Sequence, residues 1–210
     1  MKCKKFLALV MSAVLSVSIL AGCGGGGGGT SMSIKDVNDC LETVESDIRV
    51  TTDSNLNNAV RKAADEMKAS GSFSPAIANT KIRSYMKWST IDIIKDIVGS
   101  IIQLNPFIDT SYGIGYAIEE SRLERGVNVN ELASLVGIRS EQINSIGTVT
   151  TPEQFSAAVV IAVDEAIQNI MPAWLEKIVT FDYNVSARRV TTEDGVSYWV
   201  FGGQARVYTF

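Results

Sequence analysis

The chain has 210 residues, of which 46% are hydrophobic and 20% are charged, and its formal net charge is −4 at pH 7. This excess of acidic side chains disfavours binding to nucleic acid, because phosphate contacts require lysine and arginine. The chain contains no histidine, which excludes histidine-based triads, histidine-ligated metals and histidine pH switches. Its three cysteines are also too few for a cysteine-rich zinc site.

The first 22 residues have the pattern of an export signal. Three lysines precede residues 6–20, an apolar run that is too short for an ordinary membrane-spanning helix. The run ends in Leu20-Ala21-Gly22-Cys23, which resembles the lipobox of bacterial lipoproteins. The resemblance implies that Cys23 carries lipid, that residues 1–22 are removed, and that Cys23 begins the mature chain. The alternatives are an uncleaved helical anchor and an ordinary secretory peptide.

The mature chain is expected to be held at a membrane by its lipid. Loss of the three signal lysines would bring the net charge to −7, so attraction to anionic headgroups should contribute little. Residues 23–32 comprise the lipidated cysteine and a glycine-rich tether, which should hold the domain roughly 10–30 Å from the bilayer. Gly24 takes the place of the aspartate that retains many lipoproteins at the inner membrane. The resemblance therefore implies the outer membrane where there are two membranes, otherwise the cell membrane, with an extracytoplasmic domain.

Cys40 is the cysteine of the mature domain without an assigned role, because Cys3 leaves with the signal and Cys23 is lipidated. A disulfide within the mature domain is then impossible. Cys40 lies among Val37 and Leu41, which favours a small residue of the core. A reactive thiol and a bridge to a second molecule are the alternatives.

Apolar side chains at intervals of three and four residues predict helices in the first part of the domain. Ser33 caps the first, over residues 34–48, and Asp53 caps the second, which Gly71 ends. These two helices should form an antiparallel hairpin, with a coiled-coil partner surface as the alternative. Ser74-Pro75 opens a third helix.

Two further helices are expected at residues 91–104 and 109–125. The first is the most apolar segment of the domain and suits a central core helix, with insertion into a membrane surface as the alternative. Gly113 and Gly115 weaken the second as an isolated helix, by up to about 1 kcal/mol each relative to alanine. They suit a position where another helix or a ligand approaches closely, and close packing is the favoured interpretation.

The C-terminal part is predicted to begin with a helix and to end in strands. The helix opens with a threonine cap at Thr151, a proline and a capping-box glutamine, and it kinks or stops at Pro172. From Val179 apolar and polar residues alternate, which predicts a half-buried strand. A strand over 196–201, a two-residue hairpin loop at Gly202-Gly203 and a strand over 204–210 complete a three-stranded antiparallel meander.

Residues 131–146 resemble the helix-turn-helix of bacterial repressors. Ala133 takes the small position where two helices cross, and Gly137 takes the turn. The second helix offers Arg139 but also Glu141, and its flanks are not basic, although DNA binding requires cationic contacts to phosphate. A packed helical corner is therefore expected, without a nucleic-acid partner.

The pair Glu120-Ser121 distantly resembles the catalytic dipeptide of lytic transglycosylases. The resemblance implies that Glu119 or Glu120 protonates the glycosidic oxygen of peptidoglycan. The Gly-Leu-Met-Gln-like segment that follows in that family is absent. General-acid catalysis also needs a carboxyl group whose pKa is raised by a dry pocket, whereas the neighbouring glutamates and arginines indicate a solvated helix face.

Residues 33–210 are thus predicted to form a single α+β domain, with helices over 33–178 packed on a C-terminal β-meander over 179–210. No catalytic set, metal or cofactor is expected. The favoured function is non-catalytic binding of an envelope protein, peptide or glycan, and the alternative is a peptidoglycan-cleaving enzyme. The expected ligand face consists of meander aromatics, most of which also suit a core: Tyr183, Tyr198, Trp199, Phe201 and Tyr208.

Overall fold

The computed structural model describes residues 32–43, 46–88, 110–128, 148–170 and 179–209. A four-stranded mixed sheet has the strand order β1-β5-β6-β2, and a separate pair is formed by β3 and β4. The elements in chain order are α2 (Ile34–Thr43), β1 (Val50–Thr51), α3 (Ser54–Ser70), α4 (Pro75–Met86), β2 (Thr110–Glu119), α6 (Glu120–Glu124), β3 (Val127–Asn128), β4 (Thr148–Val149), α9 (Pro152–Ile170), β5 (Val179–Thr191) and β6 (Ser197–Thr209).

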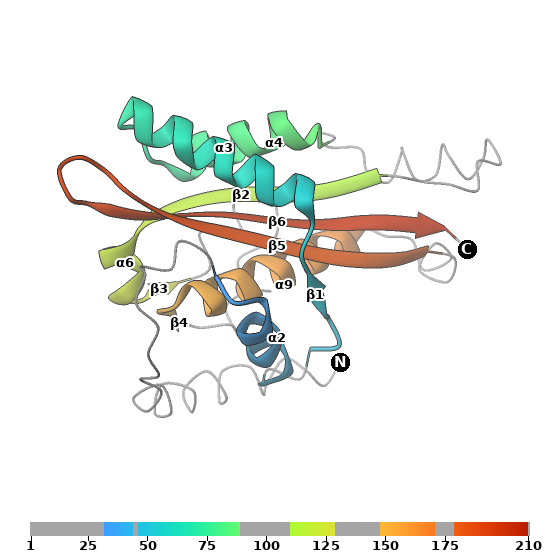
Figure 1. Cartoon of the computed structure of the whole chain (residues 1–210). Helices are drawn as coiled ribbons and strands as arrows, with labels where there is room; N and C mark the ends of the chain where they lie inside the picture. The colour runs from blue at the N-terminus through green and yellow to red at the C-terminus, as the bar shows by residue number, and fades with distance from the viewer. Residues whose placement is uncertain (1–31, 44–45, 89–109, 129–147, 171–178, 210) are drawn as a thin grey trace.

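Helices cover both faces of the sheet (Figure 1). In that view α3 and α4 lie above the sheet, and α2 and α9 lie below it. Because successive residues of a strand point to opposite faces, β6 contributes to two cores. Val200 belongs to the core beneath α3 and α4, whereas Phe201 and Val207 belong to the core around α9.

The predicted helix starts at Asp53, Ser74 and Thr151 are confirmed. The Asp53 carboxylate accepts from the Leu56 amide at 2.7 Å. The hydroxyls of Ser74 and Thr151 each accept from the backbone amide three residues later, at 3.2 Å. These caps satisfy amides that have no partner within the helix. The left-handed Gly71 (φ 63°) ends α3 as expected.

The predicted antiparallel hairpin of the first two helices is wrong. The first helix ends at Thr43, and the chain then enters β1, which pairs in parallel with β5. β1 lies at the edge of the sheet, so α2 and α3 lie on opposite faces (Figure 1). The side chain of Asn38 on α2 accepts from the Val50 amide and donates to the Val50 carbonyl, at 2.8 and 3.0 Å. This asparagine occupies the outer edge of β1.

The helix predicted over residues 109–125 is also wrong. Residues 110–119 form β2, which is antiparallel to β6, and only residues 120–124 are helical. The two glycines of this segment allow close packing, as expected, although they lie in a strand. A Cβ at Gly113 would lie 2.5 Å from the Trp88 ring, and one at Gly115 would lie 2.8 Å from the Ala78 carbonyl oxygen. Larger side chains are therefore excluded where α4 crosses β2.

The three-stranded C-terminal meander is likewise corrected, because β6 is one continuous strand from Ser197 to Thr209. Gly202-Gly203 is not a hairpin loop but the middle of this strand. A Cβ on Gly202 would approach Val60 of α3 to 2.7 Å, and one on Gly203 would approach Val159 of α9 to 2.6 Å. The two glycines allow helices to approach both faces at adjacent residues.

A domain that mixes helices with a sheet is confirmed, but the order of helices first and strands last is not. β1 and β2 come from the earlier part of the chain and form the two edges of the sheet. β5 is covered by α3 on one face and by α9 on the other, which is why Asn184 and Ser186 are buried in a strand expected to be half-buried.

Several predictions fall outside the described residues: the lipobox and tether up to residue 31, the apolar helix over 91–104 and the helix-turn-helix-like segment over 131–146. Within the described part of the chain, no helix is both long enough and apolar enough to cross a membrane.

Candidate functional site

The five aromatic residues predicted as a ligand face do not share one surface. Tyr183, Trp199 and Phe201 are buried in the core around α9. Tyr198 lies on the opposite face, where it stacks on Phe73 with ring centroids 4.0 Å apart. Tyr208 also belongs to that face, because it lies ten residues farther along the same strand. The structure therefore places these aromatics mainly as core.

Glu120 forms an ion pair in the structure. Its two carboxylate oxygens accept from Nε and Nη2 of Arg189 at 2.6 and 2.7 Å, and one of them also accepts from the Trp199 indole at 3.1 Å. The Arg189 guanidinium lowers the pKa of Glu120 below its ordinary value. A general acid needs the opposite shift. Glu119, the other candidate, accepts a hydrogen bond from the Ser121 hydroxyl.

Cys40 is a free, partly buried cysteine that packs against the core around α9. Burial, and after it the negative charge of Glu153, raises the pKa of its thiol to about 11. The thiolate is the reactive form of cysteine. At neutral pH this side chain is therefore a poor nucleophile, as expected of a small core residue.

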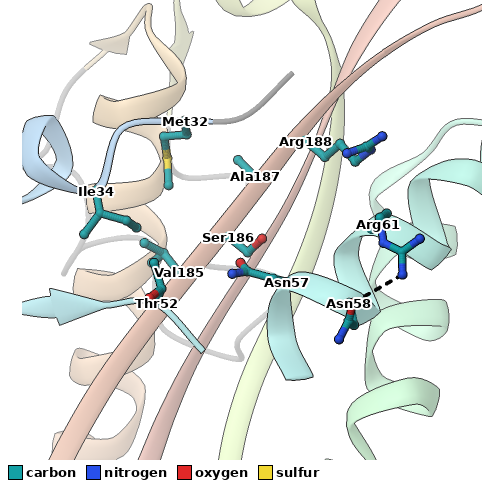
Figure 2. Close-up of a pocket in the computed structure, with 10 residues that line it drawn as sticks. All are labelled: Met32, Ile34, Thr52, Asn57, Asn58, Arg61, Val185, Ser186, Ala187 and Arg188. Atoms are coloured by element: carbon teal, nitrogen blue, oxygen red, sulfur yellow. Dashed lines mark hydrogen bonds between the residues drawn. The ribbon is translucent and has the colours of Figure 1, made fainter. Parts of the chain in front are cut away.

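A pocket of about 340 Å³ opens beside β5, and we call it the β5 pocket. Four consecutive residues of β5, Val185–Arg188, line it. Figure 2 shows Met32 and Ile34 toward one side and Arg61 and Arg188 toward the other. Thr52 and two asparagines complete the described lining: Asn57 and Asn58.

The α3 wall of the β5 pocket follows from the way the chain leaves β1. The chain turns into α3 at once because Asp53 caps this helix directly after β1. Asn57 and Asn58 therefore lie in the first turns of α3, and Arg61 follows one turn later. The Arg61 guanidinium donates to the Asn58 amide oxygen at 3.2 Å, which holds it at the pocket.

A buried chain of hydrogen bonds fixes the end of the β5 pocket at which β1 stops. The Trp88 indole donates to the side-chain oxygen Oε1 of Gln204 at 3.2 Å, and Nε2 of Gln204 donates to Oδ1 of Asn184 at 3.0 Å. The Asn184 amide in turn donates to the Thr51 hydroxyl at 2.8 Å. Thr51 and Asn184 are also the last pair of the β1–β5 register. These hydrogen bonds hold β1 against β5 at the residue before the pocket.

The β5 pocket is cationic. None of the described residues that line it is acidic, while Arg61 and Arg188 both contribute to it. The Nε atom of Arg188 is buried and has no hydrogen-bond partner within the described residues. Ser186 is 8% exposed, and no described residue hydrogen-bonds its hydroxyl. Buried polar groups normally find partners, and two arginines in a lining without described acidic residues suit a polar, anionic ligand.

The sequence interpretation missed the β5 pocket. The alternation from Val179 predicts a polar side of the strand that includes Ser186 and Arg188, but it does not predict a pocket there. The alternation of β5 was correct, but the crossing of α3 over this strand depends on tertiary structure. An arginine pair next to a buried serine has no spacing that would identify it in the sequence.

The described residues include no group of three or more histidine, cysteine, aspartate or glutamate side chains that could hold a metal ion. In comparisons with known proteins, no family profile, no curated protein and no solved structure matches this chain.

Proposed function

We propose that this protein is a lipid-anchored lipoprotein of the cell envelope whose domain binds an anionic ligand in the β5 pocket without catalysing a reaction. The lipobox-like Leu20-Ala21-Gly22-Cys23 supports the anchor. The ligand class rests on one observation: two arginines line a pocket in which no described lining residue is acidic.

The charge of the whole chain makes this local arrangement informative. Acidic residues outnumber basic ones by 23 to 19, so a cationic pocket does not follow from the average composition. An anionic ligand would pair with Arg61 and Arg188 and could accept a hydrogen bond from the Ser186 hydroxyl. Charge-assisted hydrogen bonds of this kind are about twice as strong as neutral ones.

The peptidoglycan-cleaving alternative has less support. The bidentate pair with Arg189 keeps Glu120 ionised, whereas cleavage requires a protonated acid at this position. In a binding protein the same pair joins the start of α6 to β5. We therefore propose no catalytic residue.

The anchor and the pocket can be tested separately. Intact mass and membrane fractionation of the native protein beside Cys23→Ser should show a lipidated chain that begins at Cys23 and a variant that leaves the membrane. A native chain that keeps Met1 and fractionates with the cytosol would refute the anchor.

Binding to the pocket can be measured with acidic and basic peptide pools of equal length. Arg188→Ala should weaken binding of the acidic pool about tenfold, which corresponds to about 1.4 kcal/mol. Arg125→Ala removes an exposed arginine outside the pocket and should leave binding unchanged. Equal binding of both pools, or equal effects of the two variants, would refute the proposed ligand class.

A further inference from the structure

β5 has an open edge beside the pocket. All 13 residues of β5 pair with β6 on one side. On the other side β1 pairs only with Tyr183 and Asn184. From Val185 onward no described strand pairs with this edge. Half of the backbone groups there point away from β6 and are available to an added strand.

The β5 pocket runs along this edge. Its lining includes Val185, Ser186, Ala187 and Arg188, and consecutive residues of a strand point to opposite faces. The lining residues of β5 therefore come from both faces of the strand. Val185 and Ala187 belong to the core around α9, while Ser186 lies on the face of Asn184, toward α3. The pocket therefore wraps around the edge of the strand.

The edges formed by β1 and β2 are occupied in a way that the β5 edge is not. Asn38 bonds both backbone groups of Val50 in β1, and Asn79 accepts from the Gly115 amide of β2 at 3.0 Å. Asn57 lines the β5 pocket, but its side chain makes no hydrogen bond within the described residues. The β5 edge thus keeps its backbone groups open beside an unengaged amide.

We infer that the β5 pocket takes an extended peptide with an acidic side chain, which adds to the sheet as a strand where β1 ends. This inference rests on the proposed function and specifies its ligand. Val185–Arg188 spans about 10 Å, so three or four residues of the peptide can pair. The added strand would satisfy the backbone groups of β5, as in other cases of strand addition.

The side chains around the edge provide the selectivity. A peptide side chain that points toward α3 meets Arg61, Arg188 and Ser186, which favour a carboxylate. The next side chain points the other way and meets Met32 and Ile34, which favour an apolar group. The ligand is therefore a segment in which acidic and apolar residues alternate.

The test uses the purified full-length protein and pools of N-acetylated heptapeptides with a fixed central glutamate or a fixed central lysine. The glutamate pool should bind at least tenfold more tightly, and Arg188→Ala should reduce this preference about tenfold. The best peptide should lose binding when alternate amides are N-methylated, because its backbone can then no longer pair. Arg125→Ala, outside the pocket, serves as the control for charge.

Amide hydrogen exchange gives the second readout. The peptide should slow exchange at alternate residues of Val185–Arg188, whereas sulfate should not. If the N-methylated peptide binds equally well, or a uronate oligosaccharide binds more tightly than any peptide, strand addition is refuted while anionic binding stands. If neither peptide pool, sulfate nor uronate binds, the β5 pocket is not a ligand site and the proposed ligand class falls as well.

Discussion

Substitution of Gly115 by alanine tests how closely α4 lies against β2. The new methyl group would lie 2.8 Å from the Ala78 carbonyl oxygen and 2.9 Å from the Asn79 Cα atom. Both are backbone atoms, so α4 must move as a unit. Overpacking costs about 1–3 kcal/mol, and loss of the hydrogen bond from the Gly115 amide to Asn79 adds about 1 kcal/mol. Alanine recovers about 0.5–1 kcal/mol of the strand penalty of glycine.

The expected net destabilisation by Gly115→Ala is therefore about 1–3.5 kcal/mol, or a fall in Tm of about 2–14 °C for a domain of this size. Urea and thermal unfolding, followed by circular dichroism, measure it. Ala117→Gly is the matched control, two residues along on the same face, where Ala117 is buried. Removal of that buried methyl group should cost about 1–2 kcal/mol, from the strand penalty of glycine and the lost apolar burial. If Gly115→Ala raises the stability, strand propensity alone governs both sites and the close approach is refuted.

Three further predictions concern other parts of the domain. Glu120→Gln should lower the free energy of unfolding at pH 7 by about 1–2 kcal/mol. Because Arg189 lowers the pKa of Glu120, the difference between the two proteins should shrink below about pH 4.5. A difference in urea unfolding that stays constant with pH would contradict the ion pair. Because the pKa of the Cys40 thiol is raised to about 11, Cys40 should react with iodoacetamide at pH 8 about a hundredfold more slowly in the folded than in the unfolded chain. Equal rates, measured by peptide mass spectrometry, would show that the thiol is exposed. Gln204→Leu leaves a buried indole donor and a buried amide acceptor without partners and should cost about 2–4 kcal/mol; a loss below about 1 kcal/mol in chemical unfolding would mean that water reaches them.

Local hydrogen bonds were the most predictable part of the fold. Asp53, Ser74 and Thr151 cap helices through contacts three residues away, so the sequence around each cap contains the whole interaction. The same holds for Gly71, whose left-handed conformation is favoured by glycine. Such features depend little on the rest of the chain.

Long-range pairing determined the elements that were predicted wrongly. Tyr112, Ile114, Tyr116 and Ile118 alternate with smaller residues, a pattern that fits a strand, but β2 forms because this segment pairs with β6 near the end of the chain. Gly202-Gly203 has the composition of a turn. In the strand, however, glycine is required because Val60 on one face and Val159 on the other leave no room for a side chain. The β5 pocket depends on the same tertiary arrangement, so no local pattern could indicate it.

Met32 connects the pocket to the attachment of the chain. It lines the β5 pocket, and it follows Cys23 by nine positions. A fully extended chain of that length reaches about 30 Å. A lipid on Cys23 would therefore confine the pocket to a thin layer next to the bilayer, and a ligand anchored in the same membrane would meet it by lateral diffusion. In the proposed lipoprotein, the length of the tether would select ligands by their height above the membrane as well as by their chemistry.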